Sequence, residues 1–314
     1  MIRIGILGTP ESITEHVRLL RELNGFEIIG YHPVHDSLMP DASPLSGAAR
    51  FESALDLVKM ADAVDIANPS PLLYPFVTDA IRQTKHVLIR NPFTDRSENI
   101  AGFSKLLTEA RGIIQITQPN RYNPAIMAAM PYIRHPRYIE YRRTVPFDHR
   151  QKHTSLIMNY MLNDIDLALF ITRSSIRRLS ISGVRLVSDY PDLVEARIDF
   201  ANGSVANFLV NRVTTQASHT CEFFREGNRT CVDLLHQTAN IYHINLNSTG
   251  RPFPYPEITT EPLLITPVDP LQEELVCFQT SINQKKYPQA NVDDALNALT
   301  IALELQEKLD RLCK

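Results

Sequence analysis

The chain has 314 residues, of which 44% are hydrophobic and 21% charged, and its formal net charge is −3 at pH 7. This composition is ordinary for a folded globular protein and argues against an intrinsically disordered one. The length exceeds what one hydrophobic core usually holds, so two domains are expected. The small negative charge argues against nucleic acid as a partner, because phosphate binding needs a basic surface.

The first 120 residues alternate short apolar runs with helical patterns. A strand is predicted at 2–8, followed by a loop that holds Gly5 and Gly8 and by a helix over 13–23. The other strand candidates are 26–32, 63–68, 86–91 and 113–118, and the other helical segments are 51–60, 72–83 and 96–110. Apolar strands separated by helices predict an α/β domain with a parallel, doubly wound sheet of the Rossmann type. A ligand of such a sheet binds at the carboxyl ends of the strands.

After about residue 120 the pattern changes to consecutive strands. A strand is predicted at 137–147 and a helix at 155–172, and strands follow within 176–246. Apolar and polar residues alternate in 193–200, and Ala201-Asn202-Gly203-Ser204 is a hairpin signal. Residues 248–256 are predicted as a loop, and a last helix at 291–312 begins at Asn291. This second part, 120–314, is predicted as an α+β domain with a mostly antiparallel sheet that is open on one face, after a first domain of 1–119.

Cysteines, histidines and hydropathy indicate no disulfide, metal site or membrane span. The four cysteines form no C-x-x-C pair and are expected to be reduced thiols; they are Cys221, Cys231, Cys277 and Cys313. His149 and His153 lack neighbouring metal ligands. Residues 1–20 do not form a signal peptide, and no apolar run reaches about 18 residues, so a cytoplasmic location is expected.

Three short stretches resemble one enzyme family. They are HVLIRNP (86–92) after the fourth strand, NRYNPA (120–125) after the fifth, and NDIDLALFI (163–171) in the next helix. Together with the order of elements, these stretches resemble the glucose–fructose oxidoreductase/inositol dehydrogenase (Gfo/Idh/MocA) family over essentially the whole chain. Within that family they most resemble the nucleotide-sugar branch, typified by UDP-N-acetylglucosamine 3-dehydrogenases. The resemblance implies an oxidoreductase that uses NAD or NADP on a sugar-like substrate. It also implies a homo-oligomer, a dimer or tetramer, joined through the open sheet faces.

The cofactor loop departs from the family pattern. The family loop is G-x-x-G-x-G-x-x-G, and its last two glycines fall on Pro10 and Ile13. Proline has no N–H to donate to a phosphate. The branched side chain of Ile13 is expected to block the close approach of helix to strand and of backbone to phosphate. Glu11 adds a carboxylate that would repel the phosphate. The acid for the ribose hydroxyls falls on Pro33, with Asp36 as the nearby substitute. The family's cofactor contacts fall on Gly8, Thr9, Pro10, Glu11, Asn68, Pro69, Arg90 and Pro92.

The catalytic positions depart as well. The lysine of the family's E-K-P motif falls on Asn91, and the histidine before D-I-D falls on Asn163, so neither position titrates near neutral pH. Asp164 and Asp166 remain ionisable, and they belong to the site or merely satisfy neighbouring groups. His16 is expected to have a packing role. The family's substrate contacts fall on Arg121, Tyr122, Asn123, Arg143 and Asn159, and the ligand is expected between the domains.

These departures leave three hypotheses. The leading one is a pseudoenzyme related to nucleotide-sugar dehydrogenases, with weak or absent NAD(P) binding and no ordinary hydride transfer, which acts as a binding protein or as the partner of an active paralogue. The alternative is an active NAD(P)-dependent oxidoreductase with a remodelled site, in which Asp164, Arg90 or Tyr122 handles protons. A purely structural oligomer built on the open sheet is the third.

Overall fold

The chain folds into two compact units. The computed structural model describes residues 1–34, 45, 47–68, 71–149, 152–247, 255–288 and 292–312. The first unit combines Met1–Gln118 with Leu271–Leu296, and the second combines Pro119–Pro270 with Asn297–Lys314. The first unit therefore includes a segment that lies far beyond residue 120. Asp36, Pro69, Asn291 and Cys313 lie outside the described residues, as does 248–254 of the expected loop.

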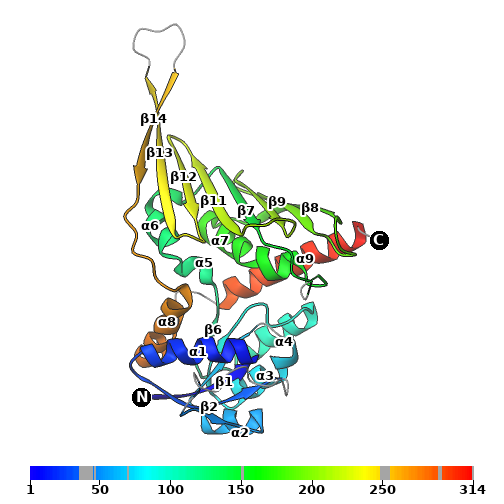
Figure 1. The fold of residues 1–314 in the computed structure, drawn as a ribbon, viewed down its shortest axis with the longest axis vertical. Coiled ribbons are helices and arrows are strands. Elements are labelled where there is room, and N and C mark those ends of the chain that lie inside the picture. The colour runs from blue at the N-terminus through cyan, green and yellow to red at the C-terminus, as the bar shows by residue number, and fades with distance from the viewer. Residues whose placement is uncertain are drawn as a thin grey trace. The chain divides into compact units, whose positions relative to one another are not determined.

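The first unit is built on a six-stranded sheet (Figure 1). Its strands are β1 (Ile2–Gly8), β2 (Phe26–Pro33), β3 (Ala49–Arg50), β4 (Ala63–Ile66), β5 (His86–Ile89) and β6 (Ile114–Ile116). Its helices are α1 (Pro10–Glu22), α2 (Ala54–Met60), η2 (Pro71–Leu73), α3 (Tyr74–Arg82), α4 (Ser97–Leu107) and α8 (Pro270–Gln284). The strand order is β3-β2-β1-β4-β5-β6 and every pair is parallel. The predicted doubly wound parallel sheet is confirmed.

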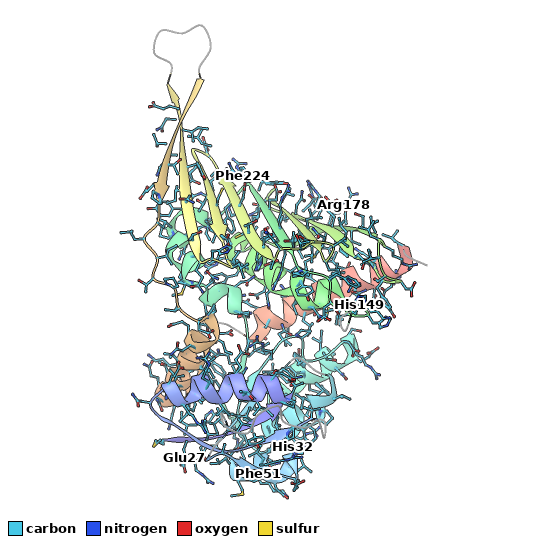
Figure 2. The ribbon with its side chains drawn as sticks, viewed as in Figure 1. Glu27, His32, Phe51, His149, Arg178 and Phe224 are labelled. Carbon is cyan, nitrogen blue, oxygen red and sulfur yellow. The ribbon has the colours of Figure 1, made fainter. Side chains whose placement is uncertain are left out.

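Helices pack on both faces of this sheet. Ile4 and Ile6 of β1 share a core with residues of α1 and with Leu275 of α8. On the opposite face, a Cβ added to Gly5 would lie 2.8 Å from Leu57 Cγ of α2, so glycine permits this close approach. At the sheet edge His32 Nδ1 donates to the carbonyl oxygen of Phe51 over 2.9 Å, and Figure 2 labels both residues.

The buried carboxylate of Glu274 anchors α8 to the first unit. Its Oε1 accepts a hydrogen bond of 2.5 Å from the amide of Gln118, directly after β6. The carbonyl oxygen of Glu274 accepts from Nε2 of Gln115 over 3.3 Å. Because these bonds satisfy polar groups inside the core, they support α8 at that position. The sequence pattern did not predict α8.

The second unit is built on an eight-stranded sheet. Its strands are β7 (Tyr138–Thr144), β8 (Ile176–Val184), β9 (Leu193–Phe200), β10 (Val205–Asn211), β11 (Ser218–Arg225), β12 (Asn228–Asp233), β13 (Thr238–Asn247) and β14 (Tyr255–Pro262). Its helices are α5 (Pro119–Tyr122), α6 (Pro124–Ile133), the π-helical turn η4 (Ile157–Met161), α7 (Leu162–Thr172) and α9 (Val292–Leu312), whose first residues belong to the first unit. The order is β14-β13-β12-β11-β7-β10-β9-β8, and only the β7–β10 pair is parallel. The prediction of a mostly antiparallel sheet is confirmed.

One face of this sheet carries helices and the other is open (Figure 1). On the covered face the rings of Tyr141 and Phe208 stack with centroids 5.0 Å apart. The predicted alternation in β9 is present, with Val194, Ala196 and Ile198 buried. The predicted hairpin joins β9 to β10, and Gly203 has φ +87°, a value that favours glycine. No helix in the described part of the chain is long and apolar enough to cross a membrane.

Candidate functional site

The carboxyl ends of the parallel strands form one edge of the first sheet. β1 ends at Gly8, β4 is followed by Asn68, β5 by Arg90 and β6 by Thr117. β1 lies between β2 and β4. The strands that follow β1 are therefore added first on one side of it and then, from β4 onward, on the other. Such a switch point is where α/β sheets bind their ligands. A Cβ on Gly8 would lie 3.0 Å from Oδ1 of Asn68, so glycine lets these two strand ends approach.

The N-terminus of α1 uses its backbone donors internally. The amide of Thr9 donates to Oδ1 of Asn68 over 2.9 Å. Pro10, the first helical residue, has no N–H, and the amide of Ser12 approaches Oγ1 of the N-cap residue Thr9 at 3.5 Å. Among residues 9–12, only Glu11 offers an amide without an internal acceptor in the described structure, and its own side chain is negative. A helix N-terminus binds phosphate through such amides, so this loop has little left to offer.

Ile13 lies in the hydrophobic core. It is 0% exposed and packs with Ile4 and Val17. The expectation that its side chain blocks a phosphate is therefore wrong. Ile13 instead fills the space between α1 and the sheet. The loop after β1 therefore departs from the family pattern in the backbone amides that it offers.

His16 has an acidic partner that the sequence reading did not assign. Its Nδ1 lies 2.6 Å from Oδ2 of Asp65 on β4, and the two side chains are 1% and 0% exposed. Nε2 of His16 and Oδ1 of Asp65 have no hydrogen-bond partner among the described residues. The pair holds α1 against the central strands, which agrees with the expected packing role of His16.

The strand ends after β5 and β6 place Asn91 beside Thr117. The amide of Asn91 donates to Oγ1 of Thr117 over 3.3 Å. Its side-chain Oδ1 is buried and has no partner among the described residues. Arg90 is half-buried, and Pro92 follows a cis peptide bond. Asparagine at this place can accept or donate hydrogen bonds but cannot transfer a proton near neutral pH.

A second polar cluster lies within the second unit, under its sheet. Oδ1 of Asp164 on α7 accepts from Nδ2 of Asn120 and lies 2.7 Å from Nε2 of His219 on β11. Asp164 is 1% exposed, and its Oδ2 has no partner among the described residues. Burial and nearby acidic groups raise the pKa of both Tyr141 and Cys221 well above their ordinary values, so these neighbours stay protonated at neutral pH.

Arg121 and Asn123 hold the second unit together. Nε and Nη2 of Arg121 each donate to one carboxylate oxygen of Asp166 over 2.7 Å, and the guanidinium lies 4.2 Å from the ring centroid of Phe170. Asn123 caps α6 and donates from Nδ2 to the carbonyl oxygen of Leu234. Their polar groups are thus engaged inside the protein. For Asp166 the structure favours the reading that it satisfies a neighbouring arginine.

The remaining predicted site residues lie on β7, η4, α7 and α5. Asn159 is exposed within this π-helical turn, and Asn163 is half-buried one turn later in α7. Nη1 of Arg143 donates to the carbonyl oxygen of Tyr160 over 3.2 Å, and its guanidinium lies 5.1 Å from the centroid of the Tyr160 ring. Tyr122, at the end of α5, is half-buried. π-helical turns occur frequently at functional sites.

His219 is the member of the cluster that sequence reading missed. The alternation in β11 places it on the same buried face as Cys221 and Phe223. A histidine at an otherwise apolar alternating position requires a polar partner, and this requirement could have singled it out. Among the described residues no group of three histidine, cysteine or acidic side chains could hold a metal ion.

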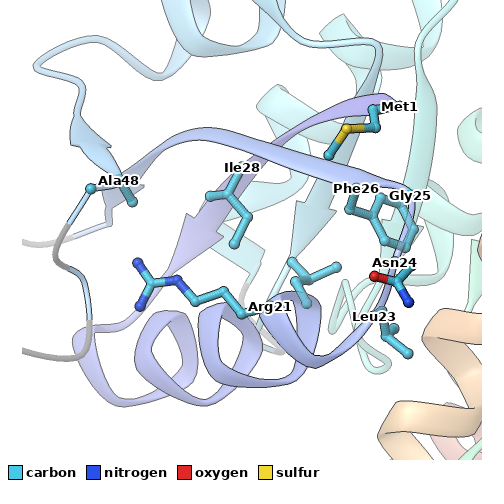
Figure 3. A pocket seen from close by; sticks show the side chains of 10 residues that line it. Met1, Arg21, Leu23, Asn24, Gly25, Phe26, Ile28 and Ala48 are labelled. Atoms are coloured by element: carbon cyan, nitrogen blue, oxygen red, sulfur yellow. The ribbon is translucent and has the colours of Figure 1, made fainter.

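A pocket of about 560 Å³ in the first unit lies away from these residues (Figure 3). It is lined by the last turn of α1, including Arg21, by Met1, which precedes β1, and by the start of β2, including Phe26. The strands of this sheet bind ligands at their opposite, carboxyl ends. This pocket is therefore not assigned to a cofactor.

The chain is similar to known dehydrogenases. No protein-family model matches it. UDP-N-acetylglucosamine 3-dehydrogenase of Acidithiobacillus ferrooxidans is 29% identical over 237 residues, which are 74% of this chain and 74% of that protein. Inositol 2-dehydrogenase of Rubrobacter xylanophilus is 22% identical over 227 residues, 68% of this chain and 65% of that protein.

Solved structures of dehydrogenases share the fold. UDP-N-acetylglucosamine 3-dehydrogenase GnnA from A. ferrooxidans superposes with a TM-score of 0.90 at 24% identity and covers 100% of this chain and 99% of its own. Dehydrogenase MviM from Clostridium difficile gives a TM-score of 0.80 at 14% identity, with 98% and 99% covered. The homologues and structural neighbours are Gfo/Idh/MocA-type dehydrogenases.

One solved structure with this fold, from Desulfitobacterium hafniense, is described as an NADPH-dependent oxidoreductase and superposes with a TM-score of 0.84 at 10% identity. Such a cofactor needs backbone amides for its pyrophosphate at the end of β1. Here the amide of Thr9 is bound to Asn68, and residue 10 has none. The residues at this strand end therefore do not fit the ordinary pyrophosphate site of this fold.

Proposed function

We propose that this chain is a nucleotide-sugar dehydrogenase homologue that binds a sugar nucleotide but has lost, or retains only weakly, NAD(P)-dependent hydride transfer. The observation that carries the proposal is the N-terminus of α1, where Asn68 takes the amide of Thr9 and Pro10 supplies none. Each lost charge-assisted hydrogen bond to a phosphate weakens binding by about 1.5–3 kcal/mol.

The two asparagines support the same proposal. Asn91 and Asn163 stand where the family resemblance expects a lysine and a histidine. Both positions would have to take up or release protons during oxidation of a sugar hydroxyl, and a carboxamide does neither near neutral pH. An asparagine still binds hydroxyl groups, which suits a site that retains its ligand.

The proposed ligand class is UDP-N-acetylglucosamine or a related sugar nucleotide. This class comes from the name of the relative that is 29% identical. Arg143 supplies a half-buried guanidinium for a phosphate group. Asn159 of η4 and Asn163 of α7, also in the second unit, supply carboxamides.

The test is a pair of measurements on the purified chain. Calorimetric titration with UDP-N-acetylglucosamine is expected to give saturable binding, while NAD⁺ or NADP⁺ with the same compound is expected to give no NAD(P)H absorbance above the background rate. Turnover comparable to ordinary dehydrogenases, at about 1 s⁻¹ or more, would contradict the proposal. Absence of any sugar-nucleotide binding would contradict it equally.

A second candidate is an active oxidoreductase with a remodelled site. The observation that favours it is the carboxylate of Asp164, which remains beside a titratable partner, His219. In this candidate, Arg90 or Tyr122 takes the proton-handling role if Asp164 does not. The same turnover measurement separates this candidate from the first.

We also propose that the open face of the second sheet joins two copies of the chain. The face carries aromatic and charged side chains, among them Phe224 and Arg178, which Figure 2 labels. The ring of Phe224 packs edge-on against that of Tyr138. Arg229 pairs with Glu222 there through two hydrogen bonds of 2.8 and 2.7 Å. A large sheet face of this kind commonly serves as an interface. Sedimentation at micromolar concentration should give a dimer or tetramer, and a monomer would contradict this.

A further inference from the structure

The pair of His219 and Asp164 fixes the hydrogen atoms of the imidazole. Nε2 of His219 lies 2.7 Å from Oδ1 of Asp164, which also accepts from Asn120. An ionised carboxylate can only accept, so Nε2 carries the hydrogen and donates it. In the neutral imidazole Nδ1 is then the acceptor. A carboxylate that orients a histidine in this way is the arrangement that keeps the opposite nitrogen available to a ligand.

Nδ1 is the nitrogen left available. The side chain of His219 is 10% exposed, whereas that of Asp164 is 1% exposed. Nδ1 has no hydrogen-bond partner in the described part of the chain, and it is not among the fully enclosed polar atoms. His16 also leaves one nitrogen without a partner among the described residues, but that nitrogen is fully enclosed in the core, whereas Nδ1 of His219 is not.

The surroundings of His219 suit a polar ligand. In the register of the sheet His219 lies directly opposite Arg143 of β7, on the same face. Directly opposite residues on one face have Cβ atoms about 4.5–5.5 Å apart. Arg143 packs on Tyr160 of η4, so one strand pair presents a cation and a neutral acceptor side by side. A phosphate and a hydroxyl of one ligand match these two groups.

We infer that His219, oriented by Asp164, accepts a hydrogen bond from a sugar hydroxyl of the bound sugar nucleotide through Nδ1. This inference rests on the proposed sugar-nucleotide binding and names a ligand contact outside the family motif positions. Asp164 and Asn120 act as positioning residues, because they touch the ligand only through His219.

The test uses His219→Gln, because Nε2 of glutamine can still donate to Asp164 while the Nδ1 acceptor is removed. The matched control is His236→Gln, since His236 is a 70% exposed side chain bonded to Asp233. Affinities for UDP-N-acetylglucosamine and for UDP, which lacks the sugar, are measured by calorimetry on the full chain. We expect His219→Gln to bind the sugar nucleotide about three- to tenfold more weakly and UDP unchanged, and His236→Gln to leave both unchanged.

A ligand-independent measurement accompanies the titrations. Imidazole ¹H–¹⁵N correlation spectra of the free protein should show His219 in the form with hydrogen on Nε2, and Asp164→Asn should change that signal. Wild-type protein that binds neither compound would contradict the proposed function and this inference with it. Sugar-nucleotide binding that His219→Gln leaves unchanged, an equal loss for UDP, or hydrogen on Nδ1 would overturn the inference alone.

Discussion

The side-chain Oδ1 of Asn68 accepts a hydrogen bond of 2.9 Å from the backbone amide of Thr9. This bond ties the end of β4 to the loop after β1 and engages one of the backbone donors at the N-terminus of α1. Proline at position 10 supplies no amide, and the described hydrogen bonds at the N-terminus of α1 are made within the protein. The Thr9 cap and the Asn68 bond together hold the turn between β1 and α1.

Restoring the amide at position 10 should strengthen cofactor binding. Pro10→Ala returns an N–H at the first helical residue, where it points toward a phosphate. One charge-assisted hydrogen bond corresponds to about a tenfold or larger gain in affinity for NADH. The matched control is Pro124→Ala, the same change at the first residue of α6. Fluorescence titration that finds no gain, or the same gain in the control, would refute the role assigned to Pro10.

Turnover should return only when proton-transfer groups return as well. Asn91→Lys and Asn163→His, added together to Pro10→Ala, should give measurable NADH formation with UDP-N-acetylglucosamine. Pro10→Ala alone should give none, because binding the cofactor does not supply a base. A stopped assay of both variants at saturating ligands checks this expectation. Turnover by Pro10→Ala alone would show that the native residues already handle the proton.

The buried pair of His16 and Asp65 should matter for stability as a pair. Asp65→Ala leaves a buried imidazole nitrogen without its partner and should lower the free energy of unfolding by about 1–3 kcal/mol. Replacing both residues by leucine should cost far less, because no unpaired polar group remains. Glu22→Ala, which removes an exposed partner of Arg18, should cost about 1 kcal/mol or less. Urea unfolding curves of the three variants measure these differences, and similar losses for all three would contradict the account.

The ionised carboxyl of Asp192 should make the stability of the second unit depend on pH. Burial alone would raise the pKa of this carboxyl, but hydrogen bonds from the amides of Val187, Leu186 and Ser188 and from the Ser188 hydroxyl hold it well below its ordinary value. Nε of Arg212 also donates to it over 2.9 Å. A depressed pKa in the folded state stabilises the protein above the unfolded pKa, about 3.9, and this stability is lost as the pH falls below it.

The variant Asp192→Asn isolates that contribution. At pH 7 its free energy of unfolding should be about 3–5 kcal/mol lower than that of the wild type, because Arg212 is left buried without its charge partner. The difference between the two proteins should shrink steadily as the pH is lowered from 5 toward 2. A difference that stays constant over this range would show that the pKa of Asp192 is not lowered by folding.

Much of the fold follows from local patterns. Continuous apolar runs such as Ala63–Ile66 predicted buried parallel strands, and the alternation of Leu193–Phe200 predicted a strand with one wet face. Asn202 and Gly203 marked the hairpin between β9 and β10. These features depend on residues close together in the chain, so their periodicity is visible in the sequence.

The parts that escaped prediction depend on distant contacts. Glu274 bonds Gln118 from 156 positions away, and His219 bonds Asp164 from 55 positions away. Ile13 was placed at a phosphate because the family loop has glycine there, whereas in this chain its side chain turns into the core. A sequence pattern gives the face on which such a residue lies but not the partner it meets.

Titration of the wild-type chain with NADH and NADPH, followed by nucleotide fluorescence or calorimetry, tests the central claim most directly. The account predicts no saturation in the micromolar range, and saturation at least about tenfold tighter in Pro10→Ala. Saturable micromolar binding by the wild-type chain, equal to that of Pro10→Ala, would contradict the claim that the loop after β1 no longer grips a dinucleotide.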